Sequence, residues 1–188
     1  DSRIIQAFES IDERTNTHER DVVTMRARLD GLAEKLKDMR SNLAEIPRDT
    51  QDPSDRKLRR VLHGKVINAS AEYLNQSYKL VDSAAAVISA NLTDLAKLAD
   101  AVRKSPDSRN GALRLKKRIQ KNVGAGKSMR SALLQLRSWA NKNPGMVGRF
   151  QSLKRLTQAL DRRISIDKTR IKSRHIDATG AIRSTRQD

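Results

Sequence analysis

Residues 4–46 read IIQAFESIDERTNTHERDVVTMRARLDGLAEKLKDMRSNLAEI, and this stretch decides the fold. One stripe of positions recurs along it at alternating spacings of four and three residues, without interruption. The stripe comprises Ile4, Phe8, Ile11, Thr15, His18, Val22, Met25, Leu29, Leu32, Leu36, Met39, Leu43 and Ile46. A period of about 3.5 residues, sustained over about six heptads, is typical of a coiled-coil seam. Such a helix is a rod of about 65 Å that must bury its seam against another helix.

The composition agrees with long helices. Of 188 residues, 32% are charged and only 3% are aromatic, and too few β-branched and aromatic runs exist to build a sheet. The absence of cysteine excludes a disulfide framework and a thiol nucleophile, and is compatible with any compartment. No apolar run is long enough to predict a membrane span. The chain begins at Asp1 rather than at methionine, so we expect a processed or partial polypeptide.

Three stretches rich in proline, glycine and polar residues interrupt the helical pattern, at 47–53, 105–111 and 143–145. They predict four helices, over roughly 2–46, 54–104, 111–142 and 144–177. Ser54 is the predicted N-cap of the second helix. Connections this short favour antiparallel neighbours.

The predicted fold is therefore all-α, with elongated antiparallel coiled-coil hairpins that form a three- to four-helix bundle. Residues 1–104 are predicted to form a long hairpin. Residues 105–178 are predicted to form a shorter, basic hairpin that packs on the first as one elongated domain, and 179–188 a frayed tail. The seam of the first helix also suits pairing with a second copy of the chain.

A few polar residues occupy seam positions of the predicted helices: Thr15, His18, Asn122 and Asp167. A polar residue in a seam lowers stability, and it can set the register or the oligomeric state. We interpret these four residues as structural rather than as parts of a ligand site.

The net charge of +17 is concentrated in one half of the chain. Residues 105–188 hold 21 basic and five acidic side chains, whereas residues 1–46 hold eight basic and ten acidic ones. Such asymmetry indicates an anionic partner that docks on the basic region.

The basic side chains of the fourth predicted helix lie on one side of it, and the third predicted helix adds further basic side chains. The predicted anion-binding residues are Arg114, Lys116, Lys117, Arg118, Lys121, Arg149, Lys154, Arg155, Arg162, Arg163, Lys168 and Arg170. A solvated helix face usually mixes charges of both signs, because unbalanced charge repels itself. The alternative interpretation is a generally basic surface, or one that pairs with the acidic first helix.

No motif in the sequence predicts catalysis, a cofactor or a metal. The segment 124–128, GAGKS, resembles the end of a phosphate-binding loop, but Lys121 stands where that motif needs glycine, and the preceding residues predict a helix rather than a strand. We interpret it as a weak stretch of helix. The three histidines are dispersed, and with no cysteine they do not form a zinc-binding pattern. We therefore expect a non-enzymatic interaction or scaffolding module.

Three kinds of anionic partner fit the basic region. The Arg-rich stripe favours nucleic acid, bound through the phosphate backbone of a duplex without sequence preference. Of the aromatic residues, only Tyr73 and Trp139 lie off the seams and are expected to be free, and two rings do not make a stacking platform for single strands.

The alternatives are an anionic membrane surface and an acidic protein. Long basic helical rods are similar to BAR-type membrane scaffolds in shape and charge only, and binding would be peripheral. A structural adaptor for an acidic protein would use the same basic half as a docking surface.

Overall fold

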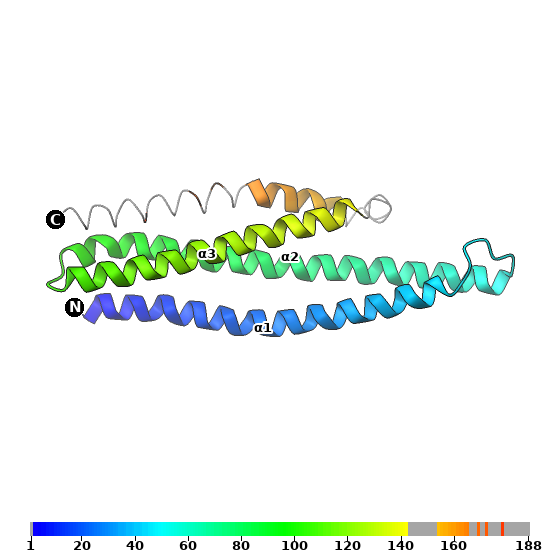
Figure 1. Ribbon diagram of the computed structural model, residues 1–188, viewed down its shortest axis with the longest axis horizontal. Coiled ribbons are helices and arrows are strands. Elements are labelled where there is room, and N and C mark those ends of the chain that lie inside the picture. Colours follow the sequence, from blue (N-terminus) through cyan, green and yellow to red (C-terminus); the bar gives the residue numbers. More distant parts are fainter. Residues whose placement is uncertain (1, 143–153, 166–168, 170–171, 173–177, 179–188) are drawn as a thin grey trace.

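A computed structural model describes residues 2–142, 154–165, 169, 172 and 178, and these form an elongated bundle of helices (Figure 1). Helix α1 spans Ser2–Ala44, α2 spans Pro53–Arg103 and α3 spans Ser108–Asn141. A further helical segment covers residues 154–165. The described residues contain no β-strand, and the predicted all-α class is confirmed.

The helix boundaries differ slightly from the prediction. The N-cap of α2 is Asp52 rather than Ser54, and its carboxylate accepts a hydrogen bond of 2.9 Å from the Ser54 backbone N–H. Pro53 occupies the first helical turn, where its missing N–H costs nothing. Helix α3 starts at Ser108 rather than at residue 111. The fourth predicted helix is described only over 154–165, and the rest of 144–177 lies mostly outside the described residues.

A side chain of α2 closes the turn between α1 and α2. Arg59 donates from Nη1 to the backbone oxygen of Leu43 at 3.3 Å and to that of Ile46 at 2.8 Å. The last carbonyl groups of a helix have no partner within the helix. Arg59 supplies donors to two carbonyls at this end and so joins the two helices at the tip of the hairpin.

The helices are arranged as a long hairpin with a third helix folded back along it. Figure 1 shows α1 and α2 running antiparallel, with α3 returning along α2 and ending before the tip of the hairpin. Near this end of α3, the rings of Trp139 and Tyr73 lie 6.4 Å apart between centroids. The tip, formed by the end of α1 and the first turns of α2, therefore extends beyond α3.

The heptad stripe of α1 is the side that faces the other helices. None of its positions is exposed, whereas most other residues of α1 are. Ile4, Phe8, Ile11 and Leu36 are buried, and the stripe positions from Thr15 to Leu32 are half-buried. The predicted seam is thus the packing face of α1.

Helix α2 packs on two sides, against α1 and against α3. Besides an apolar stripe that runs from Ile67 to Val102, it buries Ser70, Ser77 and Asn91, which are separated by multiples of seven residues. Ala84, on the same column, is half-buried. Small side chains allow a third helix to approach closely, so this column marks the second packing face of α2.

Asn91 is the centre of a polar layer that connects the three helices. Its Nδ2 donates to Thr15 Oγ1 of α1 and to Asn122 Oδ1 of α3, both at 3.0 Å. Its Oδ1 accepts a 3.0 Å hydrogen bond from Arg14, which also pairs with Asp94 at 2.8 Å. No buried polar side-chain atom of the described residues lacks a partner. A fully satisfied polar layer of this kind fixes which turns of the helices face each other.

The apolar core is continuous across the predicted division at residues 104 and 105. One cluster of buried side chains includes Phe8 of α1, Leu92 of α2, Leu115 of α3 and Leu160 of the segment 154–165. The predicted tail, 179–188, lies outside the described residues. Where it is described, the chain therefore shares one core.

Replacing glycine by alanine is expected to have opposite effects on stability at two positions of the bundle. A Cβ at Gly124, within α3, meets nothing within 4 Å, whereas a Cβ at Gly111 would lie 2.6 Å from Val102 Cγ1. We expect Gly124→Ala to raise the free energy of unfolding by about 0.5–1 kcal/mol, because alanine favours the helix. We expect Gly111→Ala to lower it by about 1–3 kcal/mol through overpacking against the buried Val102. Urea denaturation followed by circular dichroism measures both, and equal shifts in the same direction would contradict this packing.

Candidate anion-binding interface

A groove between α1 and α3 brings together four of the predicted anion-binding residues. The groove has a volume of about 550 Å³, and its α3 wall carries Arg114, Lys117, Arg118 and Lys121. They occupy positions i, i+3, i+4 and i+7, which places them along one side of α3. The α1 wall contributes Asp12, so the groove is positive on one side only.

Arg118 makes a bidentate ion pair across this groove. Its Nε donates to Asp12 Oδ1 at 2.9 Å, and its Nη2 donates to Oδ2 at 2.7 Å. The guanidinium carbon also lies 4.5 Å from the centre of the Phe8 ring. Paired donors and an aromatic surface hold a guanidinium in one orientation. Arg118 therefore links α3 to α1, and an external anion would compete with Asp12 for its donors.

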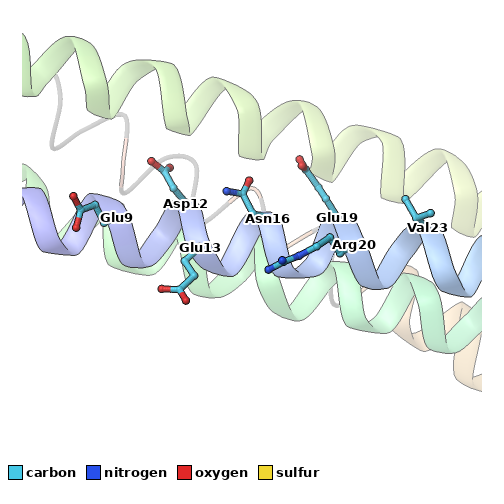
Figure 2. A pocket seen from close by; sticks show the side chains of 7 residues that line it. All are labelled: Glu9, Asp12, Glu13, Asn16, Glu19, Arg20 and Val23. Atoms are coloured by element: carbon cyan, nitrogen blue, oxygen red, sulfur yellow. The ribbon is translucent and has the colours of Figure 1, made fainter.

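Acidic side chains of α1 also partner Lys121. Its Nζ lies 3.3 Å from Glu19 Oε1. Figure 2 shows Asp12, Asn16 and Glu19 on the side of α1 that faces α3 and Glu13 on the opposite side. The shallow hollow drawn there has a volume of about 640 Å³ and is lined by Glu9, Asp12, Glu13, Asn16, Glu19, Arg20 and Val23. The acidic first helix thus neutralises part of the basic surface of α3.

Two further ion pairs hold the segment 154–165 against the bundle. Arg163 pairs with Asp82 of α2 at 3.0 Å, and Asp161 pairs with Arg137 of α3 at 3.2 Å. Figure 1 shows this segment alongside α3. Arg163 is therefore directed toward the bundle rather than toward solvent.

Six predicted residues remain as an exposed set, here called the basic face: Arg114, Lys116, Lys117, Lys154, Arg155 and Arg162. None of them forms a salt bridge with another residue of the described chain. Three other predicted residues, Arg149, Lys168 and Arg170, lie outside the described residues. The structure therefore divides the predicted set into cations with an internal carboxylate partner and cations that face solvent.

The aromatic residues off the seams are not available as a binding platform. Tyr73 and Trp139 were expected to be free, but they are half-buried and contact each other at the junction of α2 and α3. Their stacking on an external base would require this junction to open.

The glycine-containing segment 124–128 lies within α3, and Gly126 is buried in the bundle. It therefore does not form a loop that wraps a phosphate group. Among the described residues, no group of His, Asp and Glu is arranged to hold a metal ion. None of the described helices has a stretch that is apolar and long enough to cross a bilayer.

Comparisons with protein-family models, with curated proteins and with solved structures gave no match for this chain.

Proposed function

We propose that this chain is a non-catalytic helical scaffold that docks on duplex nucleic acid through its basic face. The observation that supports the proposal is that the predicted anion-binding residues fall into two groups, with and without a carboxylate partner. Arg118, Lys121 and Arg163 each have a carboxylate partner in the bundle, whereas the six residues of the basic face have none among the described residues. Uncompensated positive charge raises the energy of the folded chain, and a polyanion relieves it.

A polymer of phosphates suits the shape of this surface. Arg155 and Arg162 are both exposed and are two helical turns apart, which places them about 10 Å apart along the axis. Lys116 and Lys117 add charge further along the rod on α3, about 30 Å from Arg137, which pairs with Asp161 of the segment. Cations repeated along a rod contact successive phosphates of a duplex, and each contact releases counterions. Such binding is strong at low salt and indifferent to base sequence.

The side chains of the basic face are less suited to reading bases or binding single strands. Base stacking requires exposed aromatic rings, and Trp139 is packed against Tyr73. No large apolar side chain of the segment 154–165 is exposed. Contacts from this segment would therefore be made to backbone phosphates.

A second candidate partner is an anionic membrane surface, and one observation favours it. Leu113 is 57% exposed and lies one turn before Lys116 and Lys117, so an apolar side chain stands beside two cations. One leucine buries little apolar area, and membrane-surface helices normally present a continuous apolar face. Duplex nucleic acid remains the first candidate for that reason.

Competition between a duplex and vesicles tests the proposal. We expect the chain to bind two labelled duplexes of unrelated sequence, each about 30 base pairs, with equal affinity at about 100 mM salt. Vesicles that contain phosphatidylserine, added at the same concentration of negative charge, should leave most of the duplex bound. Failure to bind either duplex, or complete transfer to the vesicles, would contradict nucleic acid as the partner.

A further inference from the structure

We infer a separate binding site for a phosphate group at the tip of the α1–α2 hairpin. The tip contains a hollow of about 850 Å³ lined by Arg48, Thr50, Arg56, Arg59, Arg60, His63, Gly64 and Ile67. Four of these side chains are guanidinium groups, and none of the described residues that line the hollow is a carboxylate. None of the lining residues belongs to the basic face defined above.

Two of the four guanidinium groups are already held in place by the fold. Arg56 donates from Nε to the Thr50 backbone oxygen at 2.8 Å and from Nη2 to Gln51 Oε1 at 2.6 Å. Arg59 donates from Nη1 to the two carbonyls at the end of α1. A side chain that is ordered before binding loses less conformational entropy when a ligand arrives.

These bonds leave donors on both arginines for a ligand. A guanidinium carries five N–H donors, and those of Arg59 Nε and Nη2 take part in none of the hydrogen bonds described for this residue. Planar, paired donors match the oxygen atoms of phosphate better than a lysine ammonium does. Arg48 and Arg60, which are exposed at the same hollow, add two further positive charges.

Two carboxylates lie near the hollow, and one of them contacts a residue that lines it. Asp52 caps α2 by accepting from the Ser54 backbone, and Asp55 accepts a 3.4 Å hydrogen bond from Thr50 Oγ1. Neither carboxylate lines the hollow. Four guanidinium groups line the hollow, so positive charge predominates there although Asp55 lies at its edge.

The tip site is distant from the groove of Arg114 and Lys117. The groove meets α1 near Asn16, and the hollow begins at Arg48, so the two are about 45–50 Å apart along the rod. The tip can bind phosphate whether or not the basic face binds a duplex. A rod with both sites would hold a phosphate group at its tip and a polyanion along α3 and the segment 154–165.

Titration with inorganic pyrophosphate at constant ionic strength, followed by amide and arginine Nε–H signals in ¹⁵N correlation spectra, tests this inference. We expect saturable shifts at Thr50, Arg56, Arg59 and Gly64. The double variant Arg48→Gln and Arg60→Gln should weaken binding about tenfold or more. It removes two exposed side chains with no described hydrogen bond, so the helical circular dichroism should be unchanged.

The matched control is Arg26→Gln with Arg28→Gln, which removes the same charge from exposed positions of α1. Its affinity for pyrophosphate should stay within about twofold of that of the unaltered chain. Absence of saturable shifts at the tip, or equal weakening by both double variants, would overturn the site.

A second arm of the experiment separates two sources of the phosphate group. Vesicles that contain phosphatidic acid should compete with pyrophosphate for the tip if the natural ligand is a lipid headgroup, since Leu58 and Val61 are exposed on the same turns of α2. If such vesicles leave the pyrophosphate shifts unchanged, the site takes a free phosphate compound. Both results support a phosphate site.

Discussion

Asn91→Ala is expected to lower the free energy of unfolding by about 2–4 kcal/mol. The change removes hydrogen bonds to Arg14, Thr15 and Asn122 at once and leaves a cavity where the three helices meet. A buried polar group without a partner costs about 1–3 kcal/mol, and the cavity adds to this cost. Urea denaturation monitored by circular dichroism measures the difference.

A control in the same helix separates this network from helix propensity. Asn68 of α2 is exposed, so Asn68→Ala should cause no loss of stability and can add a few tenths of a kcal/mol. Equal stability of the Asn91 and Asn68 variants would show that the polar layer does not hold the helices together.

Replacing both Asn91 and Asn122 by leucine should not lower stability as Asn91→Ala does. In a chain with Asn91→Leu and Asn122→Leu, apolar side chains would fill the centre of the layer, and we expect the free energy of unfolding to be unchanged or higher. The same chain should lose its unique helix register, which sedimentation analysis would detect as additional oligomeric species. A single species identical to that of the unaltered chain would contradict a role of the layer in specificity.

The largest effect on binding is expected from the basic face. Changing Lys116, Lys117, Arg155 and Arg162 together to glutamine should reduce affinity for a duplex roughly 100-fold or more at about 100 mM salt. These residues are exposed and form no salt bridge with described residues, so the helical signal and the melting temperature should change little. Fluorescence anisotropy with a labelled duplex measures the loss.

A matched control removes four positive charges from α1 instead, by changing Arg20, Arg26, Arg28 and Lys35 to glutamine. All four are exposed, and the net charge of the chain falls by the same amount. If the basic face is the docking surface, this control should bind within about threefold of the unaltered chain. A comparable loss in both variants would show that overall charge, rather than this surface, controls binding.

The architecture could be predicted because its signals are local. Pro47, Pro53 and Pro106 interrupt helical patterns that are otherwise unbroken, so the positions of the first three helices follow from the chain alone. The seam of α1 was predicted from its period, and none of its positions is exposed. The Asp52 cap was missed because a serine one residue after the proline is an equally good cap in sequence terms.

The second packing face of α2 was missed, although the sequence carries a signal for it. Ser70, Ser77 and Asn91 recur at multiples of seven residues beside the apolar seam. In a hairpin of two helices, small and polar residues at these positions give no reason to expect a buried face. Asn91 also reaches Asn122 of α3, so this repeat indicates a packing face only when a third helix is assumed.

The candidate interface could be predicted only in outline. Composition locates the excess positive charge, but it does not tell which cations have internal partners. Asp12 and Arg118 are 106 residues apart in sequence, and they meet only when α1 and α3 lie beside each other in the bundle. The division between internally paired cations and the basic face therefore required the packed bundle.

The most direct test of the proposed docking surface is the salt dependence of duplex binding. A plot of log Kd against log salt concentration, from about 50 to 300 mM, counts the phosphates that the protein neutralises. Six phosphate contacts predict a slope with a magnitude of about 5. In the variant in which Lys116, Lys117, Arg155 and Arg162 are changed to glutamine, two contacts remain and the magnitude should be about 2. Equal slopes for the two chains would contradict the basic face as the surface that docks on nucleic acid.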